Sequence, residues 1–268
     1  MELARWLGTF RMMGRQAEAL ARPLAGTARG RRRLGRGAAG DTTIHIDRVL
    51  EGLVIREARR AGNIRLISEE MGLHNFGRPQ AALVADPLDG SANAERGIGI
   101  YAVSYALGPP EPTLGKMRLG YIRNLVSGEE YWAVRGKGAF RNGMRIRSQE
   151  GSGLHILLLE MSPWPVQAFE SSRRMVEAAG KTRCLGSMAL DLCYVASGAA
   201  SALVDLRGKM ARTLDISAGK LILEEAGGVT ADGGGLTLDD LPIDLRTRTD
   251  LLASANRRIH RRLLGLRR

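Results

Sequence analysis

The stretch ADPLDGSAN, residues 85–93, places Asp86 and Asp89 three residues apart around a proline. The apolar run of residues 81–85 leads into it and predicts a buried strand that ends in two carboxylates. Like charges this close repel each other unless a cation lies between them. The proline-restricted turn directs both carboxylates, with the carbonyl of Leu88, to one side. The motif taken alone also fits an ordinary capped turn, because Asp, Pro and Gly are common in turns.

The residues after this turn form a candidate phosphate site. Gly90 and Ser91 follow Asp89 where a short helix is expected to begin, and backbone N–H groups at a helix start can bind an anion. Oxygen ligands without His or Cys favour Mg²⁺ over Zn²⁺. Carboxylates, magnesium and a phosphate cradle together indicate metal-assisted phosphoryl transfer. Other acidic residues are expected at strand ends or helix starts, where open α/β sheets bind ligands: Asp47, Glu69, Glu70 and Asp215.

The order of elements predicts a mixed α/β (α+β) fold. The first half combines two long helices with largely antiparallel strands, whereas strands and helices alternate after about residue 153. No repeat or low-complexity linker separates the halves, so we expect a single catalytic domain, 1–268, with subdomains of roughly 1–148 and 149–268. The two helices are expected in residues 1–27 and 42–62, joined by a mobile Gly/Arg loop.

Composition excludes some classes of protein. No run approaches the roughly 20 apolar residues of a membrane span, which favours a soluble protein. Cys184 and Cys193 have no metal-site spacing and no disulfide framework around them, so we expect two free, buried thiols in a reducing cytoplasm.

Arginine supplies most of the formal charge of +12. It is densest in residues 28–37 and in the C-terminal residues 257–268. Such arginine-rich stretches can bind nucleic acid or phosphorylated ligands. Alternatively, their arginines are solvated surface residues without a ligand. Both interpretations stay open for the sequence alone.

Four motifs together resemble the inositol monophosphatase family, a group of lithium-sensitive, Mg²⁺-dependent phosphatases that includes fructose-1,6-bisphosphatases and nucleotide phosphatases. They are TTIHID (42–47), ISEE (67–70), ADPLDGSAN (85–93) and LDISAGKLILEEAGG (214–228). The resemblance extends over roughly residues 5–260. The segment DLRGKMARTLDISAG, residues 205–219, is most similar to the archaeal type, in which one site accepts inositol phosphates and fructose bisphosphate.

The resemblance implies a layered αβαβα sandwich of the sugar-phosphatase type, and a cytoplasmic homodimer. It implies a metal-dependent phosphatase, a hydrolase of carbohydrate metabolism with two or three Mg²⁺ ions, that hydrolyses fructose 1,6-bisphosphate, inositol 1-phosphate or both. The reaction would be direct in-line attack of a metal-activated water. The alternatives are a 3′-phosphoadenosine 5′-phosphate or NADP phosphatase and, in another class, an Arg-rich RNA-binding regulatory protein on the same scaffold.

The resemblance also assigns roles residue by residue. Metal ligands would be Glu69, Asp86, the Leu88 carbonyl, Asp89 and Asp215, with Asp86 bridging two ions. Asp47 would act with the Ser91 hydroxyl, and Glu69 would share the attacking water. Substrate contacts would come from Asp89, Gly90, Ser91, Gly186, Ser187, Met188 and Arg212. Asp41 would serve a third ion or cap the second helix.

Three departures from the family pattern affect these expectations. Ser91 replaces the usual Thr, which keeps the hydroxyl but loses a methyl group that restricts its rotamer. Arginines such as Arg33 and Arg36 stand in the loop where the family often has Lys. Gly208, with cations nearby, replaces the Glu that contacts inositol hydroxyls in animal enzymes. The last change favours a second phosphate group over a neutral polyol.

Overall fold

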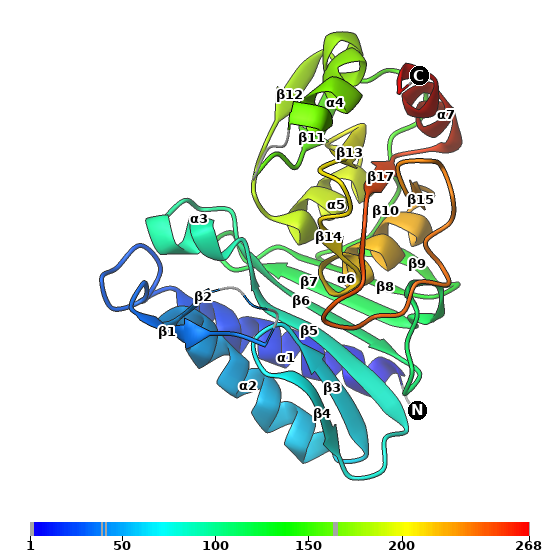
Figure 1. Cartoon of the computed structure of the whole chain (residues 1–268). Coiled ribbons are helices and arrows are strands. Elements are labelled where there is room, and N and C mark those ends of the chain that lie inside the picture. Colours follow the sequence, from blue (N-terminus) through cyan, green and yellow to red (C-terminus); the bar gives the residue numbers. More distant parts are fainter. Residues whose placement is uncertain (1–2, 39, 41, 163–165, 268) are drawn as a thin grey trace.

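The computed structural model describes residues 3–38, 40, 42–162 and 166–267. Two sheets lie one above the other, with helices between them and on both outer faces (Figure 1). This arrangement confirms the predicted layered αβαβα sandwich. Asp41, the residue with two alternative roles, lies outside the described residues.

The larger sheet has eight strands in the described chain and carries the ADPLDGSAN strand near one edge. Its pairs are antiparallel, as predicted, except that β3 and β5 are parallel. From edge to edge the strands are β10 (Met144–Ile146), β9 (Gly138–Arg141), β8 (Glu130–Val134), β7 (Leu119–Asn124), β6 (Ala102–Gly108), β5 (Ala81–Asp89), β3 (Ile64–Ser68) and β4 (Gly72–Phe76).

Two long helices, α1 (Leu3–Ala21) and α2 (His45–Ala61), cover the outer face of this sheet (Figure 1). Each has apolar residues at helical spacing on the side that faces the strands, which is why the pattern predicts both helices. The first helix ends at Ala21 and not near residue 27 as expected. Phe10 and Leu50 are fully buried there, and the ring of Phe10 lies 5.6 Å from that of Tyr105.

The inner layer consists of α5 (Met188–Ala196) and α6 (Thr213–Glu225), which pack against each other. Helix α6 contacts β5 to β9 of the larger sheet, whereas α5 contacts both sheets. Most residues of both helices are buried, because neighbours cover them on nearly all sides. Because α6 packs on the larger sheet, Asp215 in its first turn lies over that sheet.

The second sheet begins the alternating half of the chain. Its order is β12 (Lys181–Arg183), β11 (Ile156–Leu159), β13 (Ala202–Asp205), β17 (Leu251–Ser254) and β15 (Val229–Ala231). Helix α7 (Arg257–Leu266) packs on β17, and α4 (Val166–Ala178) packs beside α7. The short remaining elements are a 3₁₀ turn (Leu114–Lys116), α3 (Ser91–Arg96), and the pair β14 (Ala211–Arg212) and β16 (Arg248–Thr249).

Two expectations from the sequence are wrong. Residues 28–37 are not simply a mobile loop, because β1 (Arg33–Arg36) pairs with β2 (Thr42–Ile44). The β-branched residues of β2 favour this hairpin and delay the start of α2 to His45. Cys193 is a free buried thiol as expected, but Cys184 is exposed since it follows β12 at the sheet edge.

Helices of the described chain are all too short or too polar to cross a membrane.

Candidate active site

An irregularity in β5 shapes the end of the ADPLDGSAN strand. Asp86 pairs with Ser104 and Asp89 pairs with Ala102, so three steps along β5 match two steps along β6. The extra residue forms a β-bulge. Asp86 and Asp89, three positions apart, would point to opposite faces of a regular strand, and the bulge allows both to point to the same side. The N–H of Leu88 donates to Oδ1 of Asp86 at 2.9 Å, which fixes this carboxylate.

Two more carboxylates converge on Asp86. Strands β3 and β5 are parallel with Ser68 opposite Ala85, so Glu69, the first residue after β3, lies beside Asp86 of β5. Asp215 reaches them from the first turn of α6. Glu69, Asp86 and Asp215 each offer an oxygen within 4.8 Å of the others. Three clustered oxygen ligands fit a hard divalent cation such as Mg²⁺.

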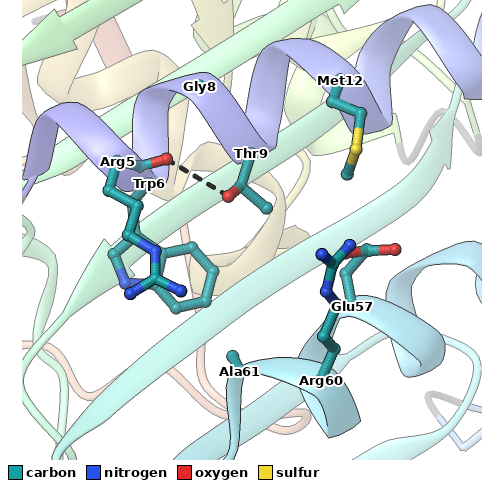
Figure 2. Close-up of a pocket in the computed structure, with 8 residues that line it drawn as sticks. All are labelled: Arg5, Trp6, Gly8, Thr9, Met12, Glu57, Arg60 and Ala61. Carbon is teal, nitrogen blue, oxygen red and sulfur yellow. Dashed lines mark hydrogen bonds and ion pairs between the residues drawn. The ribbon is translucent and has the colours of Figure 1, made fainter.

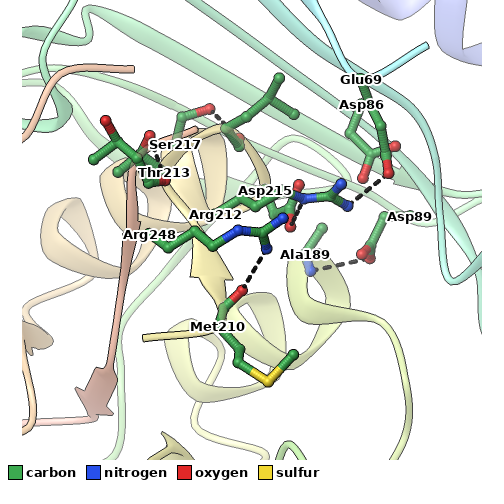
Figure 3. Close-up of polar contacts among 12 residues, drawn as sticks. Glu69, Asp86, Asp89, Ala189, Met210, Arg212, Thr213, Asp215, Ser217 and Arg248 are labelled. Atoms are coloured by element: carbon green, nitrogen blue, oxygen red, sulfur yellow. Dashed lines mark hydrogen bonds and ion pairs between the residues drawn. The ribbon is translucent and has the colours of Figure 1, made fainter. Parts of the chain in front are cut away.

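Arg212 contacts two of these carboxylates, Glu69 and Asp215. Its Nη2 is 2.6 Å from Oε1 of Glu69 and its Nε is 2.9 Å from Oδ2 of Asp215 (Figure 3). All three side chains are only 14–15 % exposed. The guanidinium therefore joins a carboxylate that follows β3 of the larger sheet to one on α6 of the adjacent inner layer.

Asp89 is not one of the three clustered carboxylates, and its contacts lead to the inner layer. Its Oδ2 accepts hydrogen bonds from the Ser187 hydroxyl and, at 3.0 Å, from the N–H of Ala189. It thereby caps α5, and Ser187 and Met188 are buried at this junction. The predicted substrate contact Ser187 thus holds a carboxylate, and Met188 begins the helix.

A cavity of about 120 Å³ lies beside the clustered carboxylates. Its lining includes all three predicted catalytic residues, Asp47, Glu69 and Ser91, which come from separate elements. The full lining is Thr42, Asp47, Glu69, Glu70, Asp86, Pro87, Leu88, Ser91 and Arg212. Oδ2 of Asp47 accepts from the N–H of Ile44 at 2.8 Å, whereas its buried Oδ1 has no hydrogen-bond partner within the described chain. Asp47 therefore keeps an acceptor for a ligand of this cavity.

Gly90 and Gly186 bring backbone close to the end of β5. Gly90 has φ of 82°, and a Cβ there would lie 2.8 Å from the carbonyl oxygen of Ile100. Asn93 connects the segments on either side of Gly90. Its Nδ2 donates to the carbonyls of Ile100 at 2.8 Å and Leu185 at 2.7 Å. Asn93 is a positioning residue that the sequence reasoning did not single out.

The electrostatics of the site favour a bound cation. Burial, opposed by the hydrogen bond from Ile44, raises the pKa of Asp47 to about 7. Burial and then the charge of Asp215 raise the pKa of Glu69, and burial and then Glu69 raise the pKa of Asp86. Removing carboxylates from water and placing them together disfavours their charged forms, and a divalent cation would reverse this.

A larger cavity of about 510 Å³ lies between α1 and α2, on the outer side of the larger sheet (Figure 2). Its lining includes Arg5, Trp6, Arg60 and one carboxylate, Glu57, which pairs with neighbouring arginines. None of the predicted site residues lines it. The smaller cavity, with its converging carboxylates, is therefore the candidate active site.

The contact between Arg212 and Glu69 joins residues 143 positions apart and has no local signal in the sequence. The ion pair between Arg212 and Asp215 can be predicted from their spacing, since residues three apart at a helix start lie on one face. The sequence reasoning placed Arg212 on the substrate, whereas here it contacts carboxylates.

Comparison with known proteins identifies relatives over nearly the whole chain. Residues 12–268 match the model of the inositol monophosphatase family. A fructose-1,6-bisphosphatase/inositol-1-monophosphatase of Methanothermobacter thermautotrophicus is 35 % identical, over 97 % of this chain and 95 % of the relative. A bifunctional NADP phosphatase/NAD kinase of Methanococcus maripaludis is 29 % identical, over 95 % of this chain but 48 % of the relative.

A solved inositol monophosphatase–fructose 1,6-bisphosphatase has the same fold, with a TM-score of 0.87 over 99 % of this chain and 100 % of that one, at 23 % identity.

Proposed function

The chain belongs to the inositol monophosphatase family, and on that basis we propose that it is a Mg²⁺-dependent phosphomonoesterase of small sugar and polyol phosphates. Its substrates would be fructose 1,6-bisphosphate and inositol 1-phosphate. The observation that supports this most directly is the convergence of Glu69, Asp86 and Asp215 within 4.8 Å beside a cavity.

Glu69, Asp86 and Asp215 would hold the metal, with the Leu88 carbonyl and the remaining oxygen of Asp89 nearby. When bound, Mg²⁺ lowers the pKa of water and neutralises the charge on phosphate. Asp47 would accept a proton at Oδ1, because Oδ2 is engaged by Ile44.

The hydroxyl of Ser91, in the same cavity, would orient the attacking water. The N–H groups of Gly90 and Ser91 would bind phosphate oxygens. Catalysis on this proposal combines positioning with charge neutralisation, and needs no covalent bond to the protein.

The decisive experiment is phosphate release by the purified protein on fructose 1,6-bisphosphate and inositol 1-phosphate, with and without Mg²⁺. Asp86→Asn should abolish turnover, because it removes one charge from the ligand cluster. Asp240→Asn is the matched control, since Asp240 is exposed and does not line the cavity. Turnover that survives without Mg²⁺, or in Asp86→Asn, would overturn the proposal.

A nucleotide phosphatase is the second candidate within the same reaction class. The relative from Methanococcus maripaludis is named an NADP phosphatase, and this chain matches about half of its length. The cavity of about 120 Å³ would take a phosphoryl group whatever molecule carries it. NADP and 3′-phosphoadenosine 5′-phosphate therefore belong in the substrate panel, and the ranking of kcat/KM decides between the candidates.

A nucleic-acid role is the candidate of another class. Arg147, Arg257, Arg258 and Arg261 line a groove of about 500 Å³ beside α7. Such a groove could follow a phosphate backbone. Binding of single-stranded RNA that falls steeply with salt and is lost in a variant with these four residues changed to Gln would support this role.

A further inference from the structure

The contacts of Arg212 show a cation already placed among the candidate metal ligands. Its guanidinium donates to Glu69 at 2.6 Å and to Asp215 at 2.9 Å. Both acceptors belong to the group of three carboxylates whose oxygens lie within 4.8 Å of one another. Figure 3 shows the guanidinium between these two carboxylates.

A divalent ion bound by this group would compete with Arg212 for the same acceptors. Mg²⁺ holds oxygen ligands at about 2.0–2.1 Å in near-octahedral geometry, so it needs the carboxylate lone pairs that the N–H groups now use. Two cations that share such ligands also repel each other, and little water screens them where the side chains are mostly buried.

The backbone around Arg212 would allow its side chain to move alone. Ala211 and Arg212 pair with Thr249 and Arg248, and the N–H of Thr213 donates to the carbonyl of Thr247 at 3.1 Å. These bonds fix the main chain while the contacts to carboxylates involve only the end of a long side chain. Displacement of the guanidinium therefore requires no rearrangement of α6.

We propose that Arg212 is an internal counter-ion that a divalent metal displaces from Glu69 and Asp215, so that metal binding is an exchange of cations. The proposal rests on the proposed function for the location of the metal. It predicts that Arg212 weakens metal affinity while it stabilises the metal-stripped protein, because three clustered carboxylates repel each other without it.

The test measures Mg²⁺ affinity by isothermal titration calorimetry on protein stripped with a chelator, for wild type, Arg212→Gln and Arg248→Gln. Arg248 is the matched control, since it lies opposite Arg212 in the β14–β16 pair but donates to the Met210 carbonyl. We expect Arg212→Gln to bind Mg²⁺ about tenfold more tightly, which is about 1.4 kcal/mol. Arg248→Gln should bind within about twofold of wild type.

Melting temperatures supply a second readout. Stripped Arg212→Gln should melt below stripped wild type and gain more from saturating Mg²⁺. If the Gln variant does not fold, Arg212→Lys tests the same exchange, because Lys keeps the charge but loses the fork that spans two carboxylates. The Lys variant should bind Mg²⁺ more tightly than wild type.

Unchanged or weaker Mg²⁺ binding in both Arg212 variants would overturn the proposal. Since the titration needs no turnover, its outcome is separate from that of the phosphatase assay. A wild type that binds Mg²⁺ but releases no phosphate would refute the proposed function and leave the exchange standing.

Discussion

The hydroxyl of Ser187 donates a hydrogen bond to Oδ2 of Asp89, and this bond joins the end of β5 to the start of α5. Both residues are buried, and the N–H of Ala189 donates to the same oxygen at 3.0 Å. The bond thus connects the two layers between which the candidate site lies. A carboxylate proposed for metal binding has one oxygen committed to the scaffold.

Replacement of Ser187 by Ala should therefore weaken both stability and activity. A hydrogen bond to a charged group contributes about 1.5–3 kcal/mol, so urea unfolding should show a loss in that range. The activity should fall as Asp89 gains freedom. Ser197→Ala is the control, because Ser197 lies at the other end of α5 and its hydroxyl donates to a backbone carbonyl, that of Tyr194, at 3.3 Å. Equal losses in the two variants would contradict the role assigned to Ser187.

Glu51 gives a prediction for pH dependence. It is buried on α2, and its Oε2 accepts from the Ser68 hydroxyl at 2.7 Å. Burial, opposed by that bond, raises its pKa from 4.5 to about 7. Between about pH 4.5 and 7, Glu51 is therefore protonated in the folded state and ionised in the unfolded state. Stability from this group is full below pH 4.5 and declines as pH rises through about 7.

Glu51→Gln should remove this decline in the free energy of unfolding. The difference of about 2.5 between the two pKa values corresponds to about 3 kcal/mol. Urea unfolding of wild type and variant at intervals from pH 4.5 to 8 measures it. Glu57→Gln, which removes another buried glutamate of α2, is the comparison variant for the effect of the substitution itself. Parallel curves for wild type and Glu51→Gln would refute the prediction.

The sequence predicted the strand and the helix start that carry part of the candidate site. Asp86 and Asp89 around a proline, and an acidic residue at the start of α6, are recognisable because strand ends and helix starts leave local patterns. What it could not predict is the register that sets Glu69 beside Asp86, because pairing of β3 with β5 depends on non-local contacts. The same limit applies to the contact between Arg212 and Glu69.

The β1–β2 hairpin was missed for a different reason. Its first strand is RLGR, in which all four residues are exposed and no alternation of apolar residues indicates a strand. The pairing depends on Thr42–Ile44, which look like the start of α2 because hydroxyl residues commonly precede helices. The local sequence of Thr42–Ile44 therefore fits both a strand and a helix start, and pairing with β1 makes it a strand.

Gly90 should tolerate no side chain. Its positive φ costs a non-glycine residue about 1–2 kcal/mol, and a Cβ would also lie 2.8 Å from the Ile100 carbonyl oxygen and 3.1 Å from that of Gly186. Gly90→Ala should lose more than this and abolish activity, since it shifts Asp89 and Ser91. Gly97→Ala, at the other end of α3, has φ of 74° but only a 3.4 Å contact. Thermal melts should separate the two, and equal losses would contradict the steric argument.

Ser91 allows a change in the opposite direction. It is exposed at the start of α3 and lines the cavity, so its hydroxyl can act on a ligand while a methyl group has room. Ser91→Thr keeps the hydroxyl and restricts χ1, which lowers the entropy lost on orienting it. We expect kcat equal to or up to about threefold above wild type for Thr. Ser91→Ala should lose at least about tenfold through the missing hydrogen bond. Steady-state kinetics at saturating Mg²⁺ measure both, and an Ala variant as active as Thr would remove Ser91 from the mechanism.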